Sequence, residues 1–512
     1  MEAATLRRGG AAAYVQTLGE AVRARSRAFW VLAGLTVLAA LLRFLTLGAQ
    51  SYHHDEIVTA TRVLPSGFFH AMDAVGFSES APPLYYALAW VWTQVTGTGE
   101  FGLRSLSALA GVLTVPVAYL VGIELRGRRA GLMAAALVAV NPMLLWYSQE
   151  ARAYALFALL CAVSLLYCVR ALRHGRRGDV LGWGIASGLA LATHYFAVFP
   201  IAAEAVLLLR RRGRDSRRGL AVIAATCLLL APLAIHQMAA GRAEWIGNFT
   251  LGHRLWETAA TLVTGETGDI IGQPQQPPLA FLPLALCLAG LALLALRANR
   301  EERRSAAVPL LVVAAAVGIP VALALLSAGK DYVLARNLIP AVVPLLIAVA
   351  IGVTLPAARR LGAAVGGALL VYSLGFCIWA SVSPDLQRPD WNAVADRLGE
   401  PEAPRATVTW ALGEAPLRYY LASGAFQVKA SEGIEWLVHE IDFVSDGRAP
   451  RPARRLLGPG FRESAHEDAG RLFIRRYRVR GPGLAPLRLR ALPDASLDFR
   501  NNGVLLDGIG PG

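Results

Sequence analysis

The chain has 512 residues, of which 55% are hydrophobic and only 17% are charged, and its mean hydropathy is +0.46. This composition excludes an ordinary soluble domain and indicates a protein that crosses a membrane several times. The net charge of +14 would suggest nucleic-acid binding in a soluble protein, but here the arginines lie in short runs between apolar segments. The positive-inside rule places such runs in the cytoplasm. The net positive charge is therefore explained by membrane topology, without a nucleic-acid partner.

Apolar segments of close to the roughly 20 residues that a bilayer requires recur along most of the chain. Residues 1–27 lack a cleavable signal, so we expect a cytoplasmic N-terminal segment and a first span that stays in place. Residues 28–381 form the predicted transmembrane domain, with about eleven spans. The predicted spans are 28–48, 101–124, 129–147, 153–172, 180–194, 197–210, 219–237, 279–297, 306–327, 336–356 and 361–381.

One further apolar stretch, residues 82–97 (PPLYYALAWVWTQVTG), decides the topology. If it crossed the membrane, the later arginine runs would lie outside. Its length of about fifteen residues and its Trp and Tyr content are typical of an interfacial helix, and as such it keeps every run inside. We therefore expect an inside N-terminus and an outside C-terminus, with helices at the outer interface.

The first outer loop, residues 49–100, carries the adjacent acids Asp55 and Glu56 directly after the first span. A carboxylate in the hydrocarbon region costs roughly 2.5 kcal/mol or more, so an acidic pair at the membrane rim is by default a site hypothesis. The other interpretation is a solvated loop with acids of no function. His53 and His54 precede the acids and could make a metal site with them and with His194 or His236, although adjacent histidines rarely chelate one ion well.

Further polar residues reach the same face where later spans leave the membrane. Gln149, Glu150 and Arg152 follow an aromatic belt, and Glu150 and Arg152 are two apart, so each needs a partner elsewhere, for which the first loop is a candidate. His194 lies between two short spans, where it could also be a packed neutral histidine. The outer face collects Asp55, Glu56, Glu79, Glu150, Arg152, His194, His236, Lys330, Asp331 and Arg336.

Arg336 opens a predicted span on the outer side, with Lys330 six residues before it. Arginine suits bidentate contact with phosphate better than lysine. A snorkelling anchor is the alternative, but an outer arginine breaks the positive-inside trend. The second outer loop, residues 238–278, contains an amphipathic stretch at 253–264, and its role stays open.

After residue 381 the composition changes to charged residues, prolines and short alternating runs. We predict a small α/β domain over residues 382–480 outside the membrane and a loosely ordered tail over 481–512. Its expected helices are 390–398 and 414–422, and its expected strands are 406–410, 426–430 and 472–479. All five cysteines fall within predicted spans, which indicates small buried side chains and no disulfides.

Several of these motifs together resemble the bacterial GT-C glycosyltransferases of family 39, which are related to protein O-mannosyltransferases and to the aminoarabinose transferase ArnT. The resemblance covers about residues 28–400 and rests on the order and sidedness of its motifs. These are Asp55-Glu56, Pro82-Pro83-Leu84-Tyr85-Tyr86, Arg104, Asn141-Pro142, Trp146 to Arg152, Thr193-His194-Tyr195-Phe196, Arg336 with Pro340, and Arg388-Pro389-Asp390-Trp391.

The resemblance implies a GT-C fold and transfer of a sugar from a polyprenyl-phosphate donor to an acceptor hydroxyl, with inversion. It assigns Asp55 as general base, for which a raised pKa from partial desolvation would be suitable, and Glu56 as an orienting or binding residue. We expect a cation at the leaving phosphate, first Arg336, with Lys330 and Arg152 as alternatives. Candidate substrate-binding residues are Glu150, Gln149, His194, Tyr85 and Arg104.

Two other functions compete with the enzyme. A transporter or flippase of lipid-linked sugars would place charges near the midplane and show inverted repeats, and the sequence shows neither. A non-catalytic membrane scaffold would leave Asp55 and Arg336 unexplained. No cofactor is assigned and a divalent cation stays open, as do the donor sugar and whether the acceptor is a lipid, glycan or protein. The arginine- and alanine-rich composition favours a bacterial plasma membrane with the active face outside.

Overall fold

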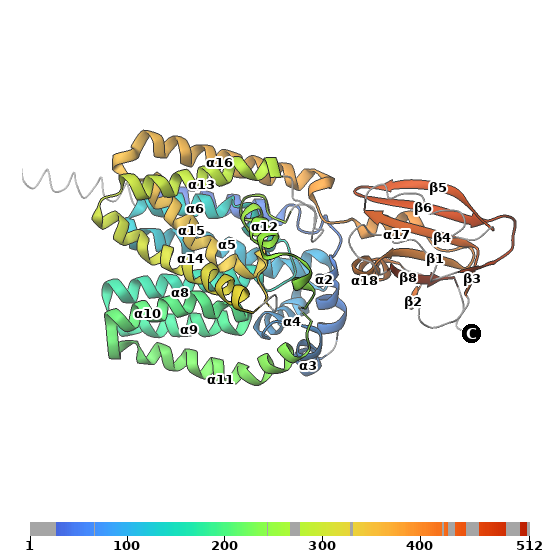
Figure 1. Ribbon diagram of the computed structural model, residues 1–512, viewed down its shortest axis with the longest axis horizontal. Coiled ribbons are helices and arrows are strands. Elements are labelled where there is room, and N and C mark those ends of the chain that lie inside the picture. Colours follow the sequence, from blue (N-terminus) through green and yellow to red (C-terminus); the bar gives the residue numbers. More distant parts are fainter. Residues whose placement is uncertain are drawn as a thin grey trace, which may run out of the picture.

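The computed structural model describes residues 27–65, 67–242, 244–266, 277–327, 331–421, 424–428, 436–446, 460–487 and 502–508. Figure 1 shows two parts, a long helix bundle and a smaller sheet domain at one end of it. Because the elements near Asp55 also lie at that end, the outer loops and the sheet domain share one face of the molecule.

Each of the eleven predicted spans coincides with helix in the structure. Within the described residues, eight segments are long and apolar enough to cross a membrane, or nine with one bent helix pair, and one of them, Tyr195–Ala239, contains two α-helices. The number of eleven crossings therefore stays a prediction, while a mainly helical polytopic fold is confirmed. The bundle consists of a helix within Arg27–Phe44, α5 Glu100–Arg126, α6 Arg128–Ala139, α7 Pro142–Ser148, α8 Tyr154–His174, α9 Arg177–Thr193, α10 Val198–Arg212, α11 Arg217–Ala239, α13 Pro277–Arg297, α14 Arg300–Leu326, α15 Val342–Val353 and α16 Arg359–Val382.

The break between α6 and α7 bends the chain by 55°. Asn141 accepts a hydrogen bond from the Leu144 N–H at 3.0 Å and Pro142 occupies the first helical position, so a new helix starts here. A Cβ on Gly111 of α5 would lie 2.0 Å from Ser148 Oγ, so the glycine permits the close approach of α5 and α7. This packing fixes the exit of the chain toward Gln149 and Glu150.

Short helices cover the end of the bundle that faces the sheet domain. The expected interfacial helix is α4, Leu84–Thr96, and the amphipathic stretch of the second loop is α12, Leu251–Thr264. Exposed apolar side chains on α4, among them Val91 and Val95, are consistent with a position at the interface. The remaining short elements are α2 His54–Val58, η1 Thr59–Val63, α3 Phe68–Ser78, η2 Tyr195–Ala197, η3 Gly213–Ser216, η4 Glu244–Asn248, η5 Ala335–Ala341, η6 Pro356–Ala358 and η7 Pro384–Leu386.

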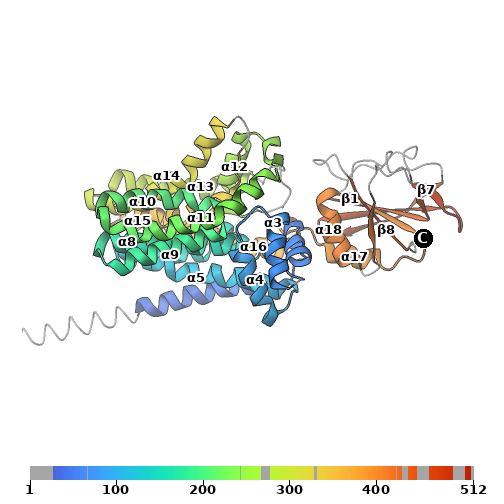
Figure 2. The same cartoon turned by 90° about the horizontal axis from the view of Figure 1, so that it is seen from below.

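The C-terminal domain is a six-stranded mixed sheet of order β2-β8-β1-β4-β6-β5, with a separate two-stranded sheet of β3 and β7. Helices α17 Trp391–Leu398 and α18 Ala411–Tyr420 lie between the large sheet and the bundle (Figures 1 and 2). The strands are β1 Arg405–Trp410, β2 Phe426–Val428, β3 Trp436–Val438, β4 Glu440–Asp446, β5 Phe461–Ala469, β6 Leu472–Val479, β7 Ala485–Leu487 and β8 Asn502–Asp507.

The structure differs from the expected domain boundary at residue 480. The segment expected to be a loose tail contributes β8, which lies between β1 and β2 in the sheet. Leu505 and Leu506 of this strand are fully buried, so apolar burial outweighs the surrounding Pro, Gly and Asn. Cys227 of α11 is also exposed on the bundle surface, unlike the other four cysteines.

The sheet domain is attached to the adjacent end of the bundle by hydrogen bonds that are buried or partly buried. Tyr420 of α18 donates to Glu100 Oε1 at 2.6 Å and accepts from the Tyr52 N–H at 2.6 Å. Ser51 Oγ donates to the Pro389 carbonyl at 2.9 Å and accepts from the Trp391 N–H at 2.8 Å. These contacts fix the entry to the domain directly beside the acidic pair.

Candidate active site

Segments far apart in the sequence meet at the end of the bundle that faces the sheet domain (Figure 1). Asp55 on α2 lies beside Arg336 of η5, 281 residues later, and beside Arg152, which follows α7. The six described members of the expected set that take part are Asp55, Glu56, Glu79, Glu150, Arg152 and Arg336. Lys330 lies outside the described residues, so its position is not part of this geometry.

Asp55 and Arg336 form a partly exposed ion pair. Arg336 Nη1 donates to Asp55 Oδ2 at 3.1 Å, and the two side chains retain 27% and 19% of their exposure. Burial raises the pKa of Asp55, but the charges of Arg336 and Arg152 outweigh it and hold the pKa well below its usual range. The expectation of a raised pKa is therefore wrong for this arrangement, because two guanidinium groups face the carboxylate.

Glu56 has a different environment, although it is the next residue. Its carboxylate accepts two hydrogen bonds of 2.7 Å from the guanidinium of Arg104 on α5, and its exposure is zero. It also accepts from the backbone N–H groups of His53 at 3.0 Å and Ala151 at 2.8 Å. Arg104 in turn donates to the carbonyls of Leu47, Gln50 and Ser51. Glu56 and Arg104 therefore join α2 to the bundle and leave no face for a substrate.

Arg152 is held by the first outer loop, as the spacing of Glu150 and Arg152 suggested. It donates to both carboxylate oxygens of Glu79 at 2.9 and 2.8 Å. Its Nη1 also donates to the Asp55 carbonyl at 3.3 Å and to Thr59 Oγ1 at 3.2 Å. A fixed positive charge thus lies beside the acidic residue, oriented by Glu79.

Glu150 pairs with Arg388, which precedes the sheet domain. Arg388 Nη2 lies 3.2 Å from Glu150 Oε2, and its guanidinium packs on the Trp146 ring at 4.3 Å from the ring centre. Burial raises the pKa of Glu150 to about 7; Arg388 opposes this rise and the charge of Glu266 adds to it. This carboxylate therefore titrates near neutral pH beside the site.

The remaining candidates, Gln149, Tyr85 and His194, make contacts within the bundle. Gln149 donates to the Leu42 and Arg43 carbonyls and to Thr46 Oγ1, so it anchors the first span. Tyr85 is fully buried, with its hydroxyl 3.3 Å from Ser107 Oγ. The His194 ring stacks on Phe157, with ring centres 4.6 Å apart.

Three residues that were not among the candidate site residues also lie here. Trp245 of η4 packs against the Arg336 guanidinium at 5.8 Å. Tyr147 donates to Glu266, which follows Gly265 at the end of α12. The positive φ of 65° at Gly265 permits that turn. The second outer loop, whose role was open, therefore contributes to the site; only its length in the sequence signalled this.

The metal hypothesis gains no support from the geometry. Among the described residues, no group of three or more His, Cys, Asp or Glu side chains has the arrangement to hold an ion. His54 lies on α2, which packs against α18, and His236 packs against Phe77 at 5.5 Å between ring centres. The expected histidine ligands thus point to different parts of the structure.

Comparison with known proteins agrees with this architecture. Residues 80–236 match the family model described as dolichyl-phosphate-mannose-protein mannosyltransferase. ArnT from Cupriavidus metallidurans bound to undecaprenyl phosphate has a similar structure, with a TM-score of 0.52, 16% identity and coverage of 87% of this chain and 98% of that chain. No curated protein sequence matches the chain.

Two other solved structures are less similar. The apo state of the same ArnT has a TM-score of 0.49 and 15% identity over 77% of this chain and 85% of that chain. An oligosaccharyltransferase from Archaeoglobus fulgidus has a TM-score of 0.43 and 15% identity over 77% of this chain and 59% of that chain.

The fold thus defines a polytopic membrane protein of the GT-C type. The matching segment and the fold agree with the resemblance to the GT-C glycosyltransferases that are related to protein O-mannosyltransferases and ArnT. Asp55 and Arg336 lie outside the matched segment, so their roles are argued from geometry.

Proposed function

We propose that this protein transfers a sugar from a polyprenyl-phosphate donor to a hydroxyl group of an acceptor on the extracytoplasmic face of the membrane. The observation that carries the proposal is the partly exposed pair of Asp55 and Arg336, 3.1 Å apart at the outer end of the bundle. The ArnT structure binds undecaprenyl phosphate, and the matching family model names a lipid-phosphate sugar donor; both support this donor class.

In the proposed reaction Asp55 is the general base. Its carboxylate takes the proton of the acceptor hydroxyl while the acceptor oxygen attacks the anomeric carbon of the sugar. Proton transfer by a positioned side chain contributes typically about 10²–10⁴-fold to a rate. One displacement breaks the bond between the anomeric carbon and the phosphate oxygen, so the anomeric configuration inverts.

Arg336 stabilises the leaving polyprenyl phosphate in this proposal. Negative charge develops on the phosphate as the glycosidic bond breaks, and a fixed guanidinium there lowers the barrier. Trp245 packs against Arg336 and orients it. Lys330 and Arg152 are the alternative cations, but Arg152 is already held by both oxygens of Glu79. We therefore assign Arg152 to positioning Asp55.

The same geometry explains how Asp55 can act as a base despite its low pKa. Arg336 and Arg152 hold the pKa down in the arrangement described. A donor phosphate that binds Arg336 weakens this effect and adds a negative charge, so the pKa of Asp55 rises when the donor is bound. The base is then strongest in the complex that reacts.

Other residues of the site have supporting roles. Glu150 faces Arg388 at the entry to the sheet domain, Gln149 anchors the first span, and His194 packs on Phe157. Glu56, Arg104 and Tyr85 hold the scaffold, because all three are fully buried. We place the protein in a bacterial plasma membrane, with the N-terminus in the cytoplasm and the sheet domain outside.

The transporter and scaffold alternatives explain less. The charged residues described above lie at one end of the bundle, whereas a transporter site is expected near the midplane. A scaffold function would leave the partly exposed ion pair of Asp55 and Arg336, from segments 281 residues apart, without a role.

The test is sugar transfer in membranes that contain the full chain, with radiolabelled polyprenyl-phosphate sugars as donors and envelope extract as acceptor. We expect wild type to transfer one donor and Asp55→Asn to lose about 10²–10⁴-fold of the rate. Asp73→Asn is the matched control, because Asp73 is an exposed acid on the same outer loop. Equal transfer by wild type and Asp55→Asn, or no transfer from any donor, would contradict the proposal.

A further inference from the structure

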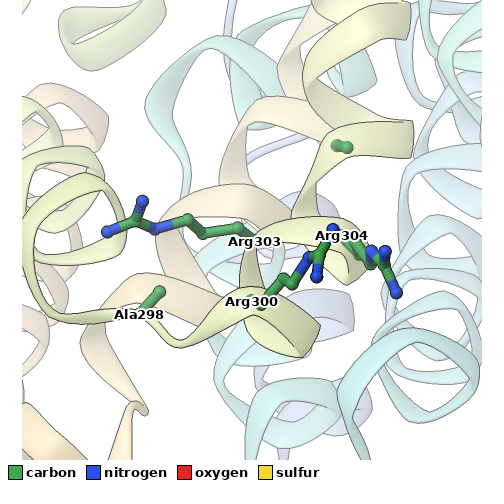
Figure 3. Close-up of a pocket in the computed structure, with 5 residues that line it drawn as sticks. Ala298, Arg300, Arg303 and Arg304 are labelled. Carbon is green, nitrogen blue, oxygen red and sulfur yellow. The ribbon is translucent and has the colours of Figure 1, made fainter.

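Three arginines occupy one face of α14 at the end of the bundle opposite to the acidic pair. Arg300, Arg303 and Arg304 have the i, i+3, i+4 spacing of neighbours on a helix, and all are exposed. With Ala298 and Ala307 they line a hollow of about 550 Å³, shown in Figure 3. Arg300 and Arg304 extend to one side of the turn and Arg303 to the other (Figure 3).

The acidic residues of the same turn do not neutralise these arginines. Glu302 accepts a hydrogen bond from Arg126 of α5 at 2.5 Å, and Glu301 lies 3.8 Å from the same guanidinium. Glu302 also accepts from the Asn299 N–H at 2.9 Å and closes the start of the helix. Both acids therefore pair with α5, and the arginine face keeps its positive charge.

The arginine face continues directly into the apolar surface that faces lipid. Ala307, Leu311, Ala314 and Gly318 follow at helical spacing and are exposed, while the opposite face, including Val312 and Pro320, is buried against the bundle. A helix with this pattern presents charge at headgroup level and apolar side chains to the acyl chains. The positive-inside rule explains why arginines occur at this end, but it does not require them on the lipid-facing side.

We propose that this surface, Arg300, Arg303, Arg304 and the hollow beside Ala307, is a binding site for an anionic phospholipid. The guanidinium groups bind the lipid phosphate, and the apolar face of α14 contacts the acyl chains. In the orientation proposed above the lipid belongs to the cytoplasmic leaflet, although binding itself does not depend on that orientation. The site is separate from the proposed donor site, which lies at the other end of the bundle.

The test counts bound lipid by native mass spectrometry of the detergent-purified full chain, titrated with phosphatidylglycerol or phosphatidylcholine. Wild type should bind phosphatidylglycerol more tightly, and Arg303→Gln/Arg304→Gln should weaken it about tenfold or more, since each arginine near a headgroup contributes about 1 kcal/mol. Glycerol phosphate should not displace the lipid. Arg128→Gln/Arg129→Gln is the matched control, because this exposed pair starts α6 at the same end of the bundle.

Ala307→Phe tests the hollow without removing charge, and it should also weaken phosphatidylglycerol binding. Equal binding of both lipids by wild type would overturn the proposal. So would equal losses in the Arg303→Gln/Arg304→Gln variant and the Arg128→Gln/Arg129→Gln control, because the effect would then be one of total charge. Phosphatidylglycerol binding retained by both Arg303→Gln/Arg304→Gln and Ala307→Phe would also overturn the proposal.

Discussion

Asp55 and Glu56 are neighbours in the sequence, but they lie in two different environments. Glu56 is fully buried, and its oxygens accept hydrogen bonds from Arg104 and from two backbone N–H groups. Asp55 keeps 27% of its exposure and contacts Arg336 through one oxygen. Because consecutive residues of a helix point in different directions, one acid can hold the fold while the other remains open for chemistry.

The comparison teaches that full burial and a complete set of hydrogen bonds mark a structural carboxylate. Partial exposure and an incomplete set mark a carboxylate that can react. A buried ion pair contributes little net stability over apolar packing, yet removing one partner leaves an uncompensated charge. A partly exposed pair can exchange one partner for a ligand at small cost. The predictions that follow test this division.

The largest effect is expected for Glu56→Gln, which leaves the buried Arg104 guanidinium without its counter-charge. Breaking such a pair destabilises a protein by about 3–5 kcal/mol. We expect the variant to be recovered from membranes in low yield, with a clearly lower thermal midpoint in detergent. Glu301→Gln is the control, since Glu301 is 82% exposed. A midpoint equal to wild type would show that Glu56 is not a structural clamp.

Asp55→Asn should have the opposite effect, with little loss of stability and a large loss of sugar transfer. Because the pair with Arg336 is partly exposed, the variant should lose about 1 kcal/mol or less of stability. The thermal midpoint should stay near that of wild type while sugar transfer falls as proposed above. Measuring both quantities on one preparation distinguishes lost chemistry from lost folding. A large drop in midpoint would assign Asp55 to the scaffold together with Glu56.

The sequence predicted much of this comparison but not its decisive part. The acidic pair, its position after the first span and the convergence of Arg152 and Arg336 followed from topology alone. The division of roles between Asp55 and Glu56 depends on Arg104 and Ala151, whose contacts with α2 bridge about 50 and 95 residues. No periodicity reports such contacts, so only the resemblance could rank the two acids.

The sheet domain shows a second reason for incomplete prediction. Strand β4 contains Glu440 and Asp442, and it was not predicted, because charged residues in a strand suggest a surface loop. In the structure Asp442 is buried and accepts from Arg476 on β6 at 2.9 Å. Cross-strand pairing therefore makes a charged segment suitable for the interior of a sheet.

Glu150 provides a smaller effect that depends on pH. Its folded pKa is raised to about 7, mainly by burial. The folded state therefore binds the proton more tightly than the unfolded state, whose pKa is the ordinary value of about 4.3. Stability from this group is present below that ordinary value and is lost as the pH rises toward about 7.

Glu150→Gln should remove this part of the pH dependence. Thermal midpoints measured between pH 5 and pH 8 should fall less steeply with rising pH in the variant than in wild type. Glu402→Gln, at an exposed position of the sheet domain, should keep the slope of wild type. Identical slopes in all three proteins would mean that the carboxylate of Glu150 is ionised throughout and that Arg388 dominates its environment.

The smallest expected effect concerns the contact that places the sheet domain beside the site. Tyr420→Phe removes one hydroxyl, which donates to Glu100 and accepts from the Tyr52 N–H. A hydrogen bond contributes about 1 kcal/mol net, so the fold should persist while the contact loosens. Hydrogen exchange should therefore become faster at the Tyr52 amide, three residues before Asp55, with exchange inside the sheet unchanged.

Tyr332→Phe is the control, since Tyr332 is 41% exposed. Unchanged exchange at Tyr52 would mean that Ser51, through Pro389 and Trp391, holds the domain without Tyr420. Faster exchange together with slower sugar transfer would show that the domain contact keeps α2, and with it the open acid, in position.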